Sequence, residues 1–118
     1  MTPGSTFGEL AAALRAFAAE RDWQQFHTPK NLAAALSVEA AEVLEHFQWL
    51  TAEQSAALAE ADRARVAEEL ADVLLYLVRL ADVLGVDLAR AARDKMAQNA
   101  LKYPADKARG SARKYTEL

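Results

Sequence analysis

The chain has 118 residues, a length that suits one domain with one compact core. Its formal net charge of −3 argues against general nucleic-acid binding, which requires a basic surface to neutralise phosphates. Cysteine is absent, which excludes disulfides and thiolate chemistry. No stretch has the pattern of a signal peptide or the length to span a bilayer, so we expect a cytoplasmic protein without a membrane partner.

The composition favours helices throughout. Isoleucine is absent, and the chain has only four glycines and three prolines. Alanine, leucine, glutamate and arginine dominate, and these are strong helix formers. We therefore predict an all-α fold.

The first predicted helix begins at Thr6, which forms a capping-box pattern with Glu9, and it ends near Asp22. An aromatic linker, residues 23–27, follows it. It carries the rings of Trp23 and Phe26 and the imidazole of His27, and Trp23 and His27 are candidates to border a planar base.

Four further helical segments are predicted. Thr28 precedes a proline, which favours an N-cap and a helix over residues 29–49. Thr51 opens a short surface helix. A third long helix over residues 62–85 ends at a glycine, and a fourth over residues 87–102 starts at a capping aspartate and stops before Tyr-Pro.

Residues 105–118 form a basic tail without periodicity, which is either mobile or folds across a site. We expect residues 1–118 to form a single domain built as a four-helix bundle. Residues 73–78 are apolar around the whole helix, and four short helices cannot cover them completely. We therefore predict an oligomer whose interface includes Leu75 and Val78.

Two pairs of carboxylates carry the main chemical signal. Glu39 and Glu42 are three residues apart, as are Glu69 and Asp72, so each pair shares one helix face. The first pair falls in the apolar stripe of its helix and the second flanks one, where unpaired carboxylates are costly. No basic residue lies within a turn on those stripes. Four oxygen donors without Cys or His suit Mg²⁺, or alternatively Mn²⁺.

The predicted fourth helix carries Lys95, Asn99 and Lys102 along one face, a pattern that matches an extended polyanion such as a triphosphate. Taken alone, a single carboxylate pair is usually a solvated helix face, and this stripe is as compatible with an exposed helix face as with a phosphate site. Four ring-bearing side chains are candidates to stack on or border a planar base: Trp23, His27, Trp49 and Tyr76. Metal ligands, phosphate-binding cations and rings together indicate a nucleotide site.

In these motifs the chain resembles the MazG-like all-α nucleoside triphosphate pyrophosphohydrolases, and within them the dCTP pyrophosphatase branch. The family motif ExxE, spacer, ExxD is matched by the two carboxylate pairs. The branch segment Asp-Trp-x-x-Phe-His-x-Pro is matched by residues 22–29. Phe47-Gln48-Trp49 and the closing residues 111–118 also match. The resemblance extends over nearly the whole chain from about Phe7.

The resemblance implies hydrolysis of a nucleoside triphosphate, dCTP or a 5-modified dCTP, to the monophosphate and pyrophosphate. It implies a tetramer built as a dimer of dimers. Carried over by position, Mg²⁺ would be held by Glu39, Glu42, Glu69 and Asp72, the phosphates by Lys95, Asn99, Lys102 and Tyr103, and the base and sugar by Trp23, His27, Trp49 and Tyr76. The chain departs from the family near Leu14, where relatives carry a histidine close to the base.

One carboxylate that is not fully engaged with metal would take the proton of the attacking water, and Glu39 or Glu42 is our candidate. Two other functions compete with this one. A di-iron carboxylate bundle needs repeated Glu-x-x-His motifs, and the chain has no second motif to pair with the region of His46. A non-catalytic helical oligomer that binds nucleotides or acts as a scaffold leaves the core-facing carboxylates unexplained.

Overall fold

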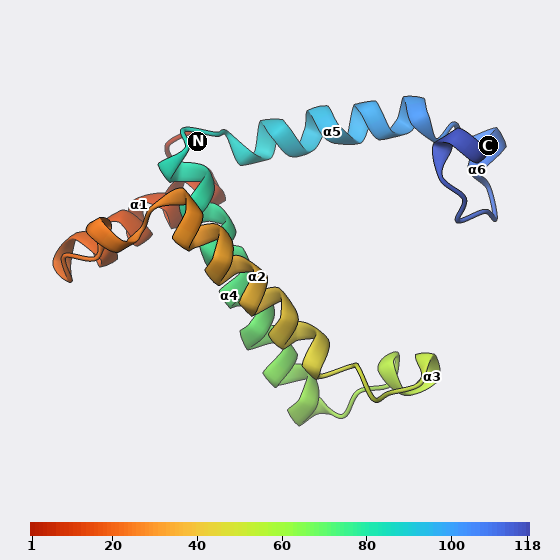
Figure 1. Cartoon of the computed structure of the whole chain (residues 1–118), viewed down its shortest axis with the longest axis horizontal. Helices are drawn as coiled ribbons and strands as arrows, with labels where there is room; N and C mark the ends of the chain where they lie inside the picture. The colour runs from red at the N-terminus through yellow and green to blue at the C-terminus, as the bar shows by residue number, and fades with distance from the viewer.

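Figure 1 shows the computed structural model, which describes all 118 residues. Every regular element is helical, and the order is α1 (Thr6–Glu20), the 3₁₀ helix η1 (Gln24–Phe26), α2 (Pro29–Glu45), α3 (Ala52–Ser55), α4 (Glu60–Val83), α5 (Leu88–Lys102), α6 (Ala105–Ala108) and the 3₁₀ helix η2 (Tyr115–Glu117). The all-α prediction is confirmed. None of the helices combines the length and the apolarity that a membrane crossing requires.

The two longest helices, α2 and α4, run antiparallel along each other and form the centre of the molecule (Figure 1). Leu32 on α2 and Val66 and Val78 on α4 are buried. Helix α1 crosses α4 near its C-terminal half and buries Ala11 and Ala18, two small side chains on one helix face that allow a close approach. The core therefore lies along α4, which packs against both other helices.

Val78 is fully buried within the single chain, with 0% of its surface exposed. The prediction that Val78 belongs to a subunit interface is therefore wrong. The sequence showed a helix that is apolar on every side, and α1 and α2 both pack against this helix within one chain.

Three of the four predicted N-caps are confirmed. The side chains of Thr28, Thr51 and Asp87 accept hydrogen bonds from backbone N–H groups in the first turns of α2, α3 and α5. Helix α1 differs, because its N-cap is Ser5, which accepts from the Gly8 N–H at 3.0 Å. The predicted capping box at Thr6 was one residue out of register.

The end of α1 determines the path of the aromatic linker. The helix stops at Glu20, two residues before the predicted position, and Asp22 adopts a left-handed backbone with φ of 53°. The Trp23 N–H then bonds the Ala18 carbonyl at 2.9 Å, as in a Schellman motif. This reversal returns the chain toward α1 and brings Trp23 against Phe17.

Helix α2 ends at Glu45 rather than at residue 49, and residues 46–49 form turns followed by a bend at Leu50. Here the Phe47 and Leu50 N–H groups bond carbonyls three residues back, which tightens the chain out of the α-helical path. Helix α4 starts and ends two residues before its predicted limits, and Gly85, with φ of 68°, ends it as predicted.

Helix α5 extends away from the other helices as an arm (Figure 1), and it has no buried residue. The predicted four-helix bundle is thus not formed by one chain alone. The radius of gyration is 17.7 Å, whereas a compact chain of this length has about 13.5 Å. Large apolar side chains are correspondingly exposed, including Trp49 at 87%, Leu101 at 83% and Met96 at 71%.

The tail folds back on the end of the arm (Figure 1). The rings of Tyr103 and Tyr115 meet edge to face with centroids 6.1 Å apart, and Lys102 Nζ lies 5.0 Å from the Tyr115 ring centroid. Within one chain, the tail therefore covers the tip of α5 and lies away from the carboxylate pairs.

Candidate active site

The antiparallel packing of α2 and α4 brings the two carboxylate pairs together. Oxygen atoms of Glu39, Glu69 and Asp72 all lie within 4.8 Å of one another. Since each pair has i, i+3 spacing, two facing helices are enough to place both pairs on one inner surface. This convergence of residues 30 positions apart in the sequence was the main geometric prediction.

Glu42 is the fourth member of the cluster. Its carboxyl group, within hydrogen-bonding reach, is the largest influence raising the pKa of Glu39, followed by desolvation and the charges of Glu42, Asp72 and Glu69. The Glu42 carboxyl likewise raises the pKa of Glu69, whereas His46, with its Nε2 3.7 Å from Glu69 Oε1, opposes this effect. Without a cation, the surrounding carboxylates therefore favour protonation of Glu39 and Glu69.

Two oxygens of the cluster are buried without any hydrogen-bond partner, namely Glu39 Oε2 and Glu69 Oε2. Buried polar atoms are normally paired, so these two point to a missing partner. A hard cation fits this donor set, because all its ligand atoms are carboxylate oxygens.

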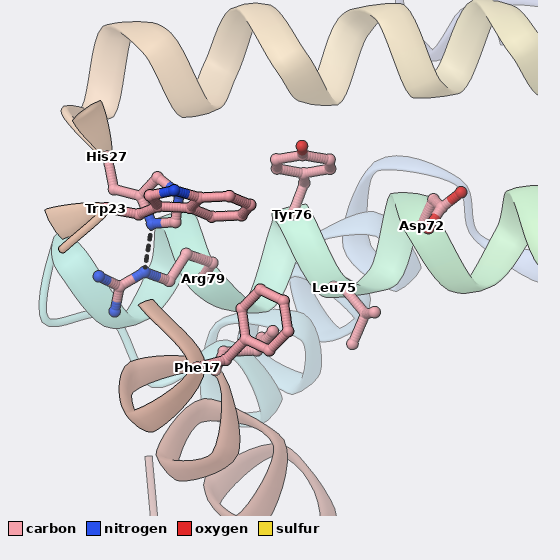
Figure 2. A pocket seen from close by; sticks show the side chains of 8 residues that line it. Phe17, Trp23, His27, Asp72, Leu75, Tyr76 and Arg79 are labelled. Carbon is pink, nitrogen blue, oxygen red and sulfur yellow. Dashed lines mark hydrogen bonds between the residues drawn. The ribbon is translucent and has the colours of Figure 1, made fainter. Parts of the chain in front are cut away.

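A cavity of about 180 Å³ lies beside this cluster (Figure 2). Its walls come from α1, from the linker and from α4, and they consist of Leu14, Phe17, Trp23, His27, Asp72, Leu75, Tyr76 and Arg79. Pockets that hold drug-sized ligands usually exceed 300 Å³, so this cavity suits a single planar ring rather than a whole nucleotide.

The rings of the cavity hold one another in place. Trp23 meets Phe17 edge to face at 5.7 Å and His27 at 6.3 Å between centroids. The Arg21 guanidinium lies 3.6 Å from the Phe17 ring centroid on the outside. In Figure 2, Trp23 and His27 enter from the linker, opposite Tyr76 on α4. The cavity is thus preformed by contacts within one chain.

Asp72 belongs both to the carboxylate cluster and to the cavity wall. Along α4, Asp72 is followed by Tyr76 and Arg79 at intervals of four and three residues, which keeps all three on one face (Figure 2). A ring bound in the cavity would therefore lie directly beside the predicted metal ligands.

The structure brings together seven of the twelve predicted site residues, namely Trp23, His27, Glu39, Glu42, Glu69, Asp72 and Tyr76. The other five lie elsewhere: Trp49 is exposed in the turns after α2, and Lys95, Asn99, Lys102 and Tyr103 are on or next to the α5 arm. One chain alone does not combine the predicted phosphate-binding residues with the carboxylates.

Sequence reasoning missed Arg79, which is the one charged residue among the buried side chains. A signal was present, since Arg79 interrupts an otherwise apolar run of α4. Leu75 was assigned to a subunit interface and lines the cavity instead, Phe17 was not among the predicted site residues, and Leu14 lies where the family resemblance placed a histidine.

The family model described as MazG-like matches residues 34–118. The chain belongs to the MazG-like family. It is 48% identical to human dCTP pyrophosphatase 1 over 99% of its own length and 70% of that protein. The bovine dCTP pyrophosphatase 1 is 51% identical over 86% of this chain and 62% of the relative.

The fold is shared with a solved relative. A crystal structure of a pyrophosphatase from Archaeoglobus fulgidus superposes with a TM-score of 0.80 and 41% sequence identity, covering 88% of this chain and 97% of that one. Identity at this level over nearly the whole chain supports the predicted enzyme class, a nucleoside triphosphate pyrophosphohydrolase. The resemblance found from the motifs is confirmed.

Proposed function

We propose that this protein is a Mg²⁺-dependent pyrophosphohydrolase for dCTP or a 5-modified dCTP. The observation that carries this proposal is Asp72, which contributes to the carboxylate cluster and to the wall of a ring-sized cavity at once. A nucleoside triphosphate has the matching arrangement, with a planar base joined through a sugar to a metal-binding chain of phosphates. The identity to dCTP pyrophosphatases supports a cytosine base.

In the proposed reaction, water adds to the α-phosphorus and the bond between that phosphorus and the bridging oxygen of the β-phosphate breaks. The products are the nucleoside monophosphate and pyrophosphate. Bound Mg²⁺ would supply charge neutralisation for the phosphates and a more acidic water. Glu39, Glu42, Glu69 and Asp72 are the residues that would hold it.

A carboxylate with a raised pKa is suited to accept a proton near neutral pH. Glu39 meets this requirement, because the neighbouring Glu42 carboxyl raises its pKa and its Oε2 is free of protein partners. We therefore assign Glu39 as the general base that takes the proton of the attacking water, with Glu42 as the alternative.

The phosphate-binding residues of α5 are proposed to act on another subunit. Lys95, Asn99 and Lys102 lie on an arm with no buried residue in its own chain, and exposed apolar side chains such as Met96 accompany them. Such a helix gains stability by packing on a second copy. A tetramer formed as a dimer of dimers would complete the bundle and deliver these cations and Tyr103 to the carboxylates of a neighbour.

The test is pyrophosphate release from a panel of canonical and 5-substituted nucleoside triphosphates with Mg²⁺. Wild-type protein is compared with the Glu39→Ala variant and with Glu45→Ala as a control, since Glu45 is an exposed carboxylate on the same helix. We expect release from dCTP-type substrates that is lost in Glu39→Ala, lost with a chelator, and kept in Glu45→Ala. Tight binding of dCTP without turnover would instead favour the non-catalytic nucleotide binder.

A further inference from the structure

Arg79 and His27 form a contact that the proposed reaction does not use. The Arg79 Nε–H donates a hydrogen bond to His27 Nδ1 at 3.1 Å, joining residues 52 positions apart (Figure 2). Only 7% of the surface of Arg79 is exposed. A buried guanidinium is costly unless it is paired, so this contact deserves a functional explanation.

The guanidinium is held from its other side as well. Arg79 Nη1 lies 3.7 Å from Asp82 Oδ2, and the same oxygen is 3.0 Å from Arg15 Nε on α1. Asp82 therefore links two helices and fixes the direction of the Arg79 fork. With the guanidinium anchored in this way, its Nε–H has a constant position relative to the imidazole ring.

The hydrogen bond determines the protonation state of His27. Arginine carries only donors, so Nδ1 must offer a lone pair. An imidazolium has N–H groups on both nitrogens and cannot accept this bond, which leaves the neutral ring with its proton on Nε2. Burial, followed by the charge of Arg79, lowers the pKa of His27, in agreement with a neutral ring.

His27 lines the cavity, and its Nε2 has no hydrogen-bond partner in the chain. We propose that Arg79 is a positioning residue that holds His27 as a fixed Nε2–H donor, so that the cavity selects a base presenting an acceptor, a carbonyl oxygen or an unprotonated ring nitrogen, at that edge. The O2 and N3 atoms of cytosine are such acceptors. This inference rests on the proposed function, because it refines how that site recognises its base.

The tautomer can be measured without any activity assay. The chain has two histidines, His27 and His46, so ¹⁵N-histidine labelling with a His46→Gln reference variant assigns the signals. Two-bond ¹H–¹⁵N correlations at neutral pH are expected to show His27 protonated at Nε2 alone. In Arg79→Met the pattern should change to a mixture of tautomers. A wild-type His27 protonated at Nδ1, or at both nitrogens, would overturn the inference whatever the activity.

Kinetics with dCTP then test whether Arg79 acts through His27. Arg79→Met should raise KM by roughly three- to tenfold, the equivalent of one hydrogen bond, with little change in kcat. In a His27→Ala background the same substitution should have no further effect. Additive effects of the two substitutions would instead assign Arg79 a purely structural role and refute the proposal.

A matched control is Arg65→Met, because Arg65 lies exposed on the same helix and pairs only with Asp62. Its KM should equal that of the wild type. Arg79→Lys keeps the charge but lacks the planar fork, and it should behave like Arg79→Met rather than like the wild type. If wild-type protein releases no pyrophosphate from any triphosphate, the proposed function fails, and the NMR measurement still decides the tautomer.

Discussion

Replacing Glu69 with Gln separates two effects of the carboxylate cluster, namely repulsion between its charges and binding of Mg²⁺. The substitution removes a negative charge and a metal ligand while it keeps the shape of the side chain. In the metal-free protein, Glu69 repels its neighbours and has an unpaired buried Oε2. We therefore expect metal-free Glu69→Gln to unfold at a higher temperature than metal-free wild type at pH 8. With Mg²⁺ the order should reverse.

The magnitude of the Mg²⁺ effect follows from linkage. At free Mg²⁺ one hundred times the Kd, the wild type gains about 2.7 kcal/mol. For 118 residues, 1 kcal/mol corresponds to about 4 °C in Tm, so the expected shift is about 11 °C. If the loss of the Glu69 carboxylate weakens Mg²⁺ binding by about a hundredfold, the stabilisation at the same Mg²⁺ concentration falls to about 0.4 kcal/mol, which is a Tm shift of about 2 °C.

The assay is thermal unfolding with chelator and with Mg²⁺, at one protein concentration because subunit association also shifts Tm. Glu68→Gln is the control, since Glu68 is the exposed neighbour on α4. A full Mg²⁺ shift in Glu69→Gln would show that Glu69 is not a ligand. A metal-free variant less stable than the wild type would refute the repulsion argument.

Three further predictions concern pH, the core and the cavity. The folded-state pKa values of Glu39 and Glu69 are raised, so their contribution to stability is present below pH 4.5 and is lost as the pH rises through the raised values. The Tm of the metal-free protein should therefore fall across that pH window. The fall should be smaller in a variant with Gln at both positions. Leu32→Ala should cost about 2–5 kcal/mol in chemical denaturation, because Leu32 is 1% exposed, whereas Leu44→Ala, at an exposed position of α2, should cost far less. Trp23→Ala should raise the KM for dCTP roughly tenfold with a smaller change in kcat, because Trp23 lines the cavity. The substitution should also abolish any quenching of tryptophan fluorescence by dCTP that arises from the cavity. Unchanged quenching would assign that signal to Trp49.

Local chemistry made much of the fold predictable from the sequence. Thr28 and Asp87 cap the helices they were expected to cap, and Gly85 ends α4 in a left-handed conformation, because each of these roles depends on a few neighbouring residues. The carboxylate cluster was predictable for a similar reason. A spacing of three residues places both carboxylates of a pair on one face of their helix, so the cluster requires only that α2 packs against α4.

Contacts between distant segments were not predictable in this way. The bond from Arg79 to His27 depends on the angle between the linker and α4, which a Schellman turn at Asp22 sets through the left-handed backbone of a residue other than glycine. Local patterns also cannot distinguish a helix covered by its own chain from one covered by a partner. For that reason Val78 was assigned to a subunit interface, although it is fully buried within its own chain.

Helix α4 connects the two halves of the site through a single rigid register. One face of α4 extends from the carboxylate cluster to the edge of the cavity. It carries, at intervals of three, four and three residues, Glu69, Asp72, Tyr76 and Arg79. At a rise of 1.5 Å per residue, about 10 Å of helix separates Asp72 from Arg79. The distance between the predicted metal ligands and the group that orients His27 is thus set by backbone hydrogen bonds, which do not depend on loops. The Arg15 to Asp82 ion pair joins α1 to this helix beside Arg79, so the two helices that line the cavity are held together at that end.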